Sequence, residues 1–253
     1  MSGRLTVVGL GPGPERWLTP AVSDILASAD ELFGYRPYLD RLPTRAGQRR
    51  HPTDNGEELA RARAALAAAE AGAAVAVVSG GDPGVFAMAS AVCEAVDKGP
   101  AAWRSLAIAF EPGVTAMLAA AACVGAPLGA DFAVISLSDN LKPWPVIERR
   151  LRLTSEADLV LALYNPASNA RGGAARAAFE VLRTCRAPAT PVVLASAVGR
   201  PDERVVIKPL GDCDGSGIDM RTLIIVGASG TRVIERPGLP PLVYTERFAR
   251  SPQ

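Results

Sequence analysis

The feature that most constrains the fold is an alternation between short runs rich in valine, isoleucine and leucine and longer runs rich in alanine. The short runs have the length and β-branched content of buried strands, and the longer runs have the spacing of amphipathic helices. This alternation is typical of α/β proteins. In the first half of the chain it predicts strands over 5–9, 74–79 and 105–110, and helices over 20–28, 57–71 and 85–96.

The alternation restarts at Asp131, after a segment interrupted by two glycines and a proline. It then predicts strands over 132–137, 159–164, 192–195, 205–208 and 223–226, with helices over 145–152 and 174–186. A chain of 253 residues is long enough for two domains of this kind. We therefore expect two α/β domains, 1–124 and 125–253, joined near Gly125–Gly129.

Composition and charge argue against several classes of function. Lysine and arginine number 27 against 26 acidic residues, and aromatic residues make up 5% of the chain. A nucleic-acid-binding protein would need a broad positive surface and stacking aromatics. The four cysteines form no CxxC pair and the chain has one histidine, so no metal site is expected. We expect a reduced, metal-free cytoplasmic protein without nucleic-acid partners.

One uncharged segment has nearly the length of a membrane span. It covers the 19 residues from Pro112 to Ala130. Glycines and a proline interrupt it, and the alanine-rich remainder, 114–124, makes only about three helical turns. The start of the chain has a single arginine and no long apolar stretch, which predicts a strand rather than a signal peptide. We expect neither a membrane span nor secretion.

The first motif, Gly9-Leu10-Gly11-Pro12-Gly13, directly follows a predicted strand. Its GxGxG spacing differs from the GxGxxG of dinucleotide-binding proteins. Pro12 and Pro14 lack the N–H groups that bind phosphate, and the next helix starts only at Pro20, after Thr19 as its N-cap. The loop is either a different kind of ligand-binding turn or a tight turn without a ligand.

Two further loops follow predicted strands. They are Ser79–Phe86, with the sequence SGGDPGVF, and Glu111–Ala116, with the sequence EPGVTA. Ligands of open α/β sheets bind at the carboxyl ends of strands, where these loops offer free backbone groups. Asp82 could accept hydrogen bonds from ribose hydroxyls, or it could cap the following helix. We expect the three loops to form one rim.

Together the loops resemble those of a known family. GLGPG, GGDPGVF and EPGVTAM, in this order, are similar to the class III S-adenosylmethionine (SAM) methyltransferases that modify uroporphyrinogen-derived tetrapyrroles. Further segments are similar to the members that act at C17 of precorrin-3B in cobalamin (vitamin B12) biosynthesis. These segments are Gly34-Tyr35 with Tyr38, Ile135–Asn140 with Pro143-Trp144, and Tyr164–Ser168. The resemblance extends from about residue 4 to residue 227.

The resemblance implies the class III tetrapyrrole methyltransferase fold, in which two α/β domains bind SAM in a cleft between them, and a homodimer. It places the methionine and ribose parts of SAM against the first domain and the adenine against the second. The residues implied to contact the cofactor are Pro12, Gly80, Gly81, Asp82, Val85, Thr115, Ala116, Tyr164, Ala197, Val198 and Thr222.

The implied reaction methylates C17 of precorrin-3B and contracts the ring to precorrin-4, leaving S-adenosyl-L-homocysteine (SAH). Methyl transfer needs two aligned reactants and no protein nucleophile, and the sequence has no GxSxG motif. Loss of C20 from the ring, as an acetyl group on C1, needs a base near the C20 hydroxyl and an acid at the opening lactone. Asp139 is the first candidate and Tyr35 the second, and the alternative for Asp139 is an ordinary turn residue.

The implied substrate carries many carboxylates, which a nearly neutral protein must meet with local positive charge. Between Gly34 and His51 the chain has five arginines and one aspartate, and guanidinium groups bind carboxylates well. The alternative for this basic segment is a solvated loop. The substrate-binding candidates are Gly34, Tyr38, Arg45, Arg49, Ser138 and Asn140.

Alternatives to this function remain open at this point. The cobalt-containing counterpart of the substrate leaves no motif in the sequence. Another precorrin or a diphthamide-type protein target would fit the shared loops, although the SLSD and YNPAS segments argue against both. A nucleotide-binding module without catalysis is the alternative from a different class.

Overall fold

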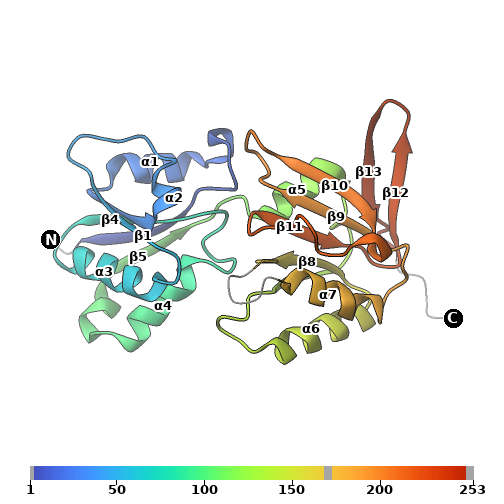
Figure 1. Ribbon diagram of the computed structural model, residues 1–253. Coiled ribbons are helices and arrows are strands. Elements are labelled where there is room, and N and C mark those ends of the chain that lie inside the picture. The colour runs from blue at the N-terminus through green and yellow to red at the C-terminus, as the bar shows by residue number, and fades with distance from the viewer. Residues whose placement is uncertain (1–2, 168–172, 249–253) are drawn as a thin grey trace. The chain divides into compact units, whose positions relative to one another are not determined.

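The computed structural model describes residues 3–167 and 173–248. Contacts divide the chain into two compact units, the first ending at Thr115 and the second beginning at Ala116. Each unit has its own five-stranded sheet covered by helices, which confirms the expected α/β fold (Figure 1). Helix α5 (Ala116–Val124) is grouped with the second unit because it packs against β11 (Thr222–Val226) and β13 (Leu239–Thr245), whereas the boundary expected from the sequence follows this helix.

The first unit contains a parallel sheet with the strand order β3-β2-β4-β1-β5. In a parallel sheet the carboxyl ends of all strands lie along one edge, so the loops after β1, β4 and β5 share that edge. The strands are β1 (Arg4–Gly9), β2 (Glu31–Tyr35), β3 (Arg49–Thr53), β4 (Ala74–Ser79) and β5 (Ala107–Glu111). The helices are α1 (Pro20–Ser28), α2 (Arg36–Leu39), α3 (Glu58–Glu70), α4 (Met88–Lys98) and the 3-10 helices η1 (Glu15–Trp17) and η2 (Ala101–Ser105).

Alternating side chains build a hydrophobic layer on each face of this sheet. Leu5 and Val7 of β1 belong to the cluster formed with α3 and α4, whereas Val8 belongs to the cluster formed with α1 and α2. Figure 1 shows the two helix pairs on opposite sides of the sheet. Because successive strand residues point to opposite faces and both faces are buried at the centre of the sheet, β1 and β4 are largely apolar runs in the sequence.

The sequence pattern does not predict β2 and β3. Strand β2 contains a glutamate and a glycine, and the edge strand β3 reads RRHPT, so neither has the apolar run of a buried strand. The helix expected over 85–96 begins later, at Met88. It is delayed because Phe86 has a φ of 51° and Ala87 is extended, and neither conformation continues a helix.

The second unit contains a mixed sheet with the strand order β10-β9-β11-β8-β7. Strands β7 and β8 are parallel, whereas β11 runs antiparallel to β8 and β9. The elements besides α5 and β11 are β7 (Phe132–Ser136), β8 (Val160–Tyr164), β9 (Pro191–Ser196), β10 (Arg204–Pro209), α6 (Trp144–Glu156), α7 (Ala174–Arg183) and η3 (Leu210–Asp212). A smaller sheet joins β12 (Thr231–Arg236), β13 and β6 (Gly125–Ala126).

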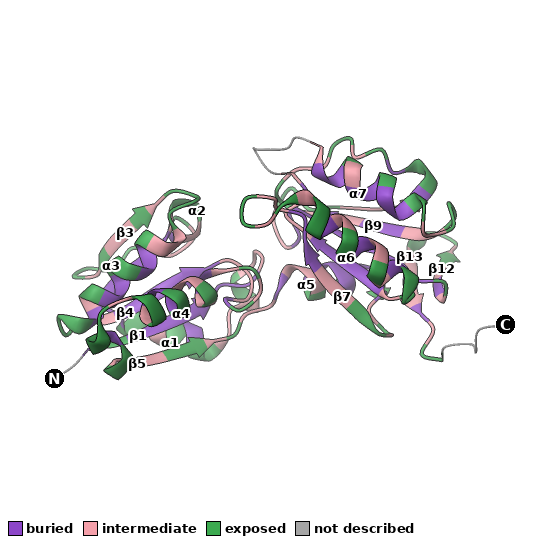
Figure 2. Cartoon of the chain, turned by 90° about the horizontal axis from the view of Figure 1, so that it is seen from below, coloured by how far each residue is buried: buried purple, intermediate pink, exposed green. Residues whose placement is uncertain are grey.

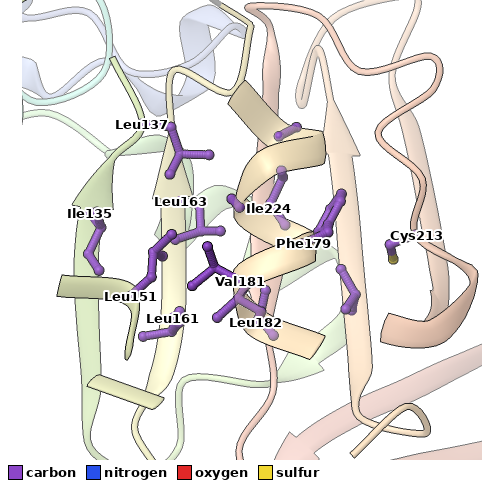
Figure 3. Packing of buried hydrophobic residues seen from close by; sticks show 14 of the residues in the cluster. Ile135, Leu137, Leu151, Leu161, Leu163, Phe179, Val181, Leu182, Cys213 and Ile224 are labelled. Carbon is purple, nitrogen blue, oxygen red and sulfur yellow. The ribbon is translucent and has the colours of Figure 1, made fainter. Parts of the chain in front are cut away.

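Helices α6 and α7 cover one face of the mixed sheet. Leu151 of α6 and Phe179 of α7 are fully buried in one cluster with Leu161 and Leu163 of β8 (Figure 3). Burying a side chain of this size contributes about 1.5–3 kcal/mol. Figure 2 shows the same pattern in each unit, with buried residues in the sheets and exposed residues on the outer sides of the helices.

Within residues 3–167 and 173–248, no helix combines the length and the apolar character needed to cross a bilayer. The uncharged segment identified in the sequence contains α5, which has only nine residues. In the same part of the chain, no three histidine, cysteine, aspartate or glutamate side chains are grouped so that they could hold a metal ion.

Candidate functional site

Three glycine-bearing loops meet at the carboxyl edge of the first unit's sheet. We call them loop 1 (residues 9–13, after β1), loop 2 (79–86, after β4) and loop 3 (111–115, after β5). Gly11 of loop 1 and Gly81 of loop 2 form an antiparallel bridge with two backbone hydrogen bonds of 3.1 Å. The expectation that the loops form one rim is confirmed.

Glycines allow the backbones of the three loops to come into direct contact. A Cβ atom on Gly113 would lie 2.3 Å from the carbonyl oxygen of Gly81 and 2.8 Å from the carbonyl carbon of Gly9. A Cβ atom on Gly9 would lie 2.6 Å from the same oxygen of Gly81. A side chain at either position would collide with backbone atoms. The loops therefore present backbone groups, rather than side chains, where they meet.

The carboxylate of Asp82 connects loop 2 to loop 3. Its Oδ1 accepts a hydrogen bond from Gly84 N at 2.8 Å, and its Oδ2 accepts one from Gly113 N at 3.1 Å. Bonds to a charged acceptor are stronger than neutral ones, so this carboxylate fixes the two loops to each other. The alternative role as a helix cap is wrong, because α4 begins at Met88 and has Ala87 at its N-cap.

Two tyrosines lie beside loop 2. The rings of Tyr35 and Tyr38 meet edge to face, with centroids 5.3 Å apart and an interplanar angle of 88°. A Cβ atom on Gly80 would lie 2.6 Å from Cζ of Tyr38, so this ring packs directly on the backbone of Gly80. A Cβ atom on Gly34 would likewise lie 3.1 Å from Cγ of Leu39. A substrate-binding candidate, Tyr38, thus contacts a cofactor candidate, Gly80.

The other candidates of the first unit also lie on these loops. Pro12 and Val85 are half-buried on loops 1 and 2, and Thr115 is buried at the end of loop 3. Phe86, at the end of loop 2, is 52% exposed and has a positive φ of 51°, a region that bulky residues seldom adopt. Strain of this kind persists only where the surrounding structure holds the loop, and it clusters at binding sites.

Two arginines of the basic segment bind backbone carbonyl groups of the first unit. Arg50 donates hydrogen bonds to the carbonyl oxygens of Leu39 and Leu42, both at 3.1 Å. Arg41 donates to carbonyl oxygens of loop 1. These guanidinium groups hold backbone segments in place, a role that the sequence does not reveal.

Arg49 is paired at the far end of the sheet. It forms an ion pair with Glu31, whose side chain is only 8% exposed, and Nε2 of His51 lies 2.7 Å from the other carboxylate oxygen of Glu31. Glu31 and Arg49 are neighbours at the amino ends of β2 and β3, whereas Tyr35 is at the carboxyl end of β2. Arg45 is exposed. The structure does not bring Arg49 together with Tyr35.

The Glu31 cluster predicts a loss of stability in acid. Burial alone would raise the pKa of Glu31, but hydrogen bonds and charge from Arg49 and His51 hold it below its ordinary value of 4.5. A carboxylate with a depressed pKa stabilises the fold above its unfolded pKa, and this contribution is lost as pH falls through the folded pKa. We expect Glu31→Gln to lower the free energy of unfolding by about 1–3 kcal/mol at neutral pH. The loss should become small once the pH has fallen through the lowered pKa of Glu31, as measured by urea denaturation along an acid series that starts at neutral pH.

Glu94→Gln is the matched control for this prediction. Glu94 pairs with Lys98 on the exposed face of α4, and such exposed pairs contribute little to stability. It should leave the unfolding free energy nearly unchanged at both pH values. An equal loss for Glu31→Gln at neutral and acidic pH would contradict the role given to the Glu31 charge.

In the second unit, the segments ISLSDN and YNPAS come together at the ends of β7 and β8. Ser136 lies beside Tyr164 in the parallel register, and Leu137 N donates to the carbonyl oxygen of Tyr164 at 2.8 Å. Asn165, with a φ of 53°, donates from Nδ2 to Ser136 Oγ at 2.9 Å. Ser168, at the end of the second segment, lies outside the described residues.

A tight loop after β7 carries the acid/base candidate. Asp139 is half-buried in it, and Asn140 N donates to Ser138 Oγ at 3.5 Å. Lys142 Nζ donates to the carbonyl oxygen of Ser138 at 3.3 Å and closes the loop. Burial, together with the charge of Arg150, lowers the pKa of Lys142. Sequence reasoning missed this lysine, although it lies within the ISLSDN–PW segment.

The hydroxyl group of Tyr164 holds the start of helix α5. Its Oη accepts a hydrogen bond from Met117 N at 3.0 Å, in the first turn of the helix, where N–H groups have no intrahelical partners. Ala116 directly precedes Met117. Two cofactor candidates, Tyr164 and Ala116, therefore lie at one place in the second unit.

The remaining candidates meet where β9 ends and β11 begins. Ala197, with a φ of 51°, and Val198 are buried in the turn after β9, and Ala197 N donates to the carbonyl oxygen of Arg221 at 3.1 Å. Thr222 opens β11 and is also buried. The antiparallel pairing of β9 with β11 brings these three residues together.

Asp219 accepts hydrogen bonds from residues at the start of β11. Its Oδ1 accepts a hydrogen bond from Thr222 Oγ1 at 2.9 Å, and its Oδ2 accepts one from Arg221 Nε at 3.1 Å. Burial alone would raise the pKa of Asp219, but these bonds and the charge of Arg221 hold it below its ordinary value. Sequence reasoning missed Asp219, because an aspartate before a strand is indistinguishable from an ordinary turn residue.

Comparison with known proteins assigns the family. Residues 4–214 match the sequence profile described as Tetrapyrrole (Corrin/Porphyrin) Methylases. The chain belongs to this family. The resemblance indicated by the loop motifs is therefore confirmed, and the glycine-bearing rim described above is part of a tetrapyrrole methylase.

Individual members of the family are similar to this chain over nearly its whole length. It is 57% identical over 248 residues to the precorrin-3B C(17)-methyltransferase of a Sinorhizobium species, covering 98% of each chain. It is 38% identical over 242 residues to a probable cobalt-factor III C(17)-methyltransferase of Salmonella typhimurium, covering 95% of this chain and 99% of the relative. Among solved structures, the methyltransferase CobJ superimposes with a TM-score of 0.92 at 46% identity, covering 97% of this chain and 100% of that one.

Proposed function

We propose that the protein transfers the methyl group of SAM to C17 of precorrin-3B, with coupled ring contraction to precorrin-4, in cobalamin biosynthesis. The observation that carries this proposal is the 57% identity, over nearly the whole chain, to a relative named for that reaction. The convergence of loops 1, 2 and 3 gives it a structural basis, because these loops form a backbone-lined edge suited to a small polar ligand.

The rim fits SAM better than it fits a dinucleotide. A pyrophosphate needs several backbone N–H groups at a helix N-terminus, whereas Pro12 and Pro14 remove two such donors from this loop region. Gly9 and Gly113 leave no room for side chains where the loops meet, so main-chain groups are presented to the ligand. SAM has no pyrophosphate, and its amino acid and ribose parts can use main-chain donors and acceptors.

We assign cofactor contacts to the residues that the family resemblance implies. In the first unit they are made by the three loops, and in the second by the ends of β8, β9 and β11 with the start of α5. The assigned residues are Pro12, Gly80, Gly81, Asp82, Val85, Thr115, Ala116, Tyr164, Ala197, Val198 and Thr222. When bound, SAM supplies an electrophilic methyl group on a sulfonium centre. The residues align this group with the substrate carbon and exclude water, and good alignment lowers the barrier by about 7–11 kcal/mol.

On the substrate side, acid/base and binding roles fall to the residues indicated by the sequence. Asp139, and after it Tyr35, would act as base toward the C20 hydroxyl and as acid toward the lactone. Gly34, Tyr38, Arg45, Arg49, Ser138 and Asn140 are assigned to substrate binding. Support differs among them, since Tyr38 contacts Gly80 whereas Arg49 is paired with Glu31.

Anaerobic incubation with SAM and precorrin-3B tests the reaction. The expected product has gained one methyl group at C17 and carries an acetyl group at C1, as read by mass spectrometry and NMR. Isothermal titration with SAH and with NAD separates the alternatives. Binding of the dinucleotide but not of SAH would favour the nucleotide-binding module and contradict the proposal.

The cobalt-containing counterpart is a second candidate. It is supported by the 38% identity to the probable cobalt-factor III C(17)-methyltransferase, against 57% for the metal-free counterpart. Parallel assays with cobalt-precorrin-3B and precorrin-3B decide between them. A higher kcat/KM for the cobalt form would replace the first substrate with the second.

We further propose a cytoplasmic homodimer without nucleic-acid or membrane partners. The nearly balanced charge and the low aromatic content support the absence of nucleic acid. The dimer rests on the family resemblance. Light scattering coupled to size-exclusion chromatography measures the mass, and a monomer at micromolar concentration would contradict the dimer.

Replacing Asp82 is expected to weaken the binding of SAH. Asp82→Ala would remove the hydrogen bond from Gly113 N that joins loop 3 to loop 2 and the one from Gly84 N within loop 2, so SAH affinity should fall about tenfold, or about 1.4 kcal/mol. Asp82→Asn should not rescue binding. An amide has only one oxygen acceptor, and its NH₂ group would face one of the two N–H donors, Gly84 N or Gly113 N.

Asp24→Ala, on the exposed face of α1, serves as the matched control and should leave SAH affinity unchanged. Titration calorimetry measures all three variants. Full affinity in Asp82→Asn would show that the second acceptor oxygen is not needed, which would contradict the role of this carboxylate as a connection between two loops.

A further inference from the structure

Loop 1 is held from one side by a guanidinium group. Nη2 of Arg41 donates to the carbonyl oxygens of Gly13 at 3.1 Å, Leu10 at 3.3 Å and Gly11 at 3.4 Å. Its Nη1 also approaches the carbonyl oxygen of Gly11, at 3.5 Å. Arg41 follows α2 and is separated from the loop by 28 to 31 positions in the sequence. The contact is therefore a product of the tertiary fold.

The carbonyl groups of loop 1 explain why a cationic group stabilises it. Three of its carbonyl groups point at one place, where their negative ends repel each other unless a cation lies between them. Pro12 has no N–H group, and Leu10 N and Gly11 N donate to carbonyl oxygens of loop 2, so these positions supply no donor to the carbonyl groups of loop 1. Gly11 is the residue that pairs with loop 2, and its carbonyl oxygen accepts from both Gly81 N and Arg41. Arg41 thus reinforces the residue that joins the two loops.

We propose that Arg41 is a positioning residue for SAM binding, which acts by holding loop 1 against loop 2 rather than by binding carboxylates of the tetrapyrrole. This inference rests on the proposed function, since it concerns the cofactor site of a SAM-dependent enzyme. The arginines of the basic segment then have different roles. Arg41 serves the cofactor loops, and any contribution to the substrate comes from other residues of the segment, such as Arg45.

The contact uses both terminal nitrogens of the guanidinium group, since Nη2 meets three carbonyl oxygens and Nη1 also meets that of Gly11. A guanidinium spreads its donors over a planar fork, whereas a lysine ammonium is a compact point charge on a flexible stem. A lysine at position 41 would bring one nitrogen on a shorter side chain and would lose the Nη1 contact, so we expect it to replace Arg41 only in part. Arg36, five positions earlier and exposed at the start of α2, is the matched arginine for comparison.

The test compares Arg41→Ala, Arg41→Lys and Arg36→Ala by titration with SAH and by steady-state kinetics with SAM and precorrin-3B. We expect SAH affinity to fall about tenfold in Arg41→Ala and by a smaller factor in Arg41→Lys, and to stay unchanged in Arg36→Ala. The KM for SAM should rise by a similar factor while the KM for precorrin-3B changes little. Methylguanidinium at millimolar concentration should restore part of the SAH affinity of Arg41→Ala and should have no effect on the wild type.

The outcomes separate this inference from the proposed function. If the wild type does not bind SAH, the proposed function fails and the inference fails with it. If the wild type binds SAH and Arg41→Ala binds it equally well, only the inference fails. A raised KM for precorrin-3B with unchanged SAH affinity would instead make Arg41 a substrate-binding residue. Should Arg41→Ala not fold, Arg41→Lys decides by the same comparison of the two KM values.

Discussion

Replacing Gly113 by alanine is expected to remove SAH binding almost completely while the second unit stays folded. The new Cβ atom would lie 2.3 Å from the carbonyl oxygen of Gly81 and 2.8 Å from the carbonyl carbon of Gly9. Both contacts are with backbone, which cannot rotate away as a flexible side chain could. Loops 1, 2 and 3 must therefore separate, and the Asp82–Gly113 hydrogen bond is lost as well.

The expected magnitude is a loss of SAH affinity of about 100-fold or more, which corresponds to about 2.7 kcal/mol or more. Overpacking at a close contact commonly costs about 1–3 kcal/mol of stability, so the unfolding midpoint should also fall. Titration calorimetry measures the affinity, and circular dichroism confirms that the variant is folded at the temperature used.

Gly173→Ala is the matched control. Gly173 precedes α7 with a negative φ of −134°, and a Cβ atom there would have no neighbour within 4 Å. This variant should bind SAH like the wild type. If Gly113→Ala retained full affinity, the close meeting of the three loops would not be what makes the cofactor site.

Replacing Asp139 by asparagine is expected to slow ring contraction about 100-fold or more, the usual contribution of a general acid or base, while methyl transfer slows much less. The reason is that methyl transfer depends on alignment, whereas loss of C20 requires proton movement at the hydroxyl and the lactone. Asparagine keeps the shape of the side chain and removes its ability to exchange a proton. Rapid-quench sampling with mass analysis would show a methylated, uncontracted species that accumulates.

Two further variants complete this experiment. Asp131→Asn, at an exposed position just before β7, should leave both steps unchanged. Tyr35→Phe tests the second candidate. If it rather than Asp139→Asn blocks contraction selectively, the acid/base role moves to Tyr35. Equal slowing of both steps in Asp139→Asn would give Asp139 the structural role of a turn residue.

Much of the fold could be predicted from the sequence because the signals are local. Helix α1 begins at Pro20, and Thr19 Oγ1 accepts a hydrogen bond from Val22 N at 3.2 Å, as its N-cap pattern predicts. Strand β4 and helix α3 follow the expected alternation. Strand β3, with the sequence RRHPT, escapes such prediction because an edge strand need not be apolar, and its place depends on pairing with β2.

In the candidate site, too, some features can be predicted from local sequence and others depend on the tertiary fold. Glycines and prolines at strand ends mark loops 1, 2 and 3 in the sequence, because these residues determine local backbone conformation. Their mutual contacts are not local, since Gly9, Gly81 and Gly113 come from strands that are distant in the chain and adjacent in the sheet. The sequence therefore indicates the loops, and strand order brings them together.

By itself, the sequence determined the α/β class, most element positions, the loops that form the rim and the likeness to tetrapyrrole methyltransferases. The tertiary structure alone decided what the charged side chains of this region do. The sequence allows Asp82 to cap a helix, whereas in the structure its two oxygens accept hydrogen bonds from Gly84 N and Gly113 N. The sequence also gives Arg41 no role apart from that of the other arginines in the basic segment, whereas in the structure it donates to loop 1. The physical reason is that a charged side chain takes its role from the groups that surround it, and in a parallel sheet those groups come from distant parts of the chain.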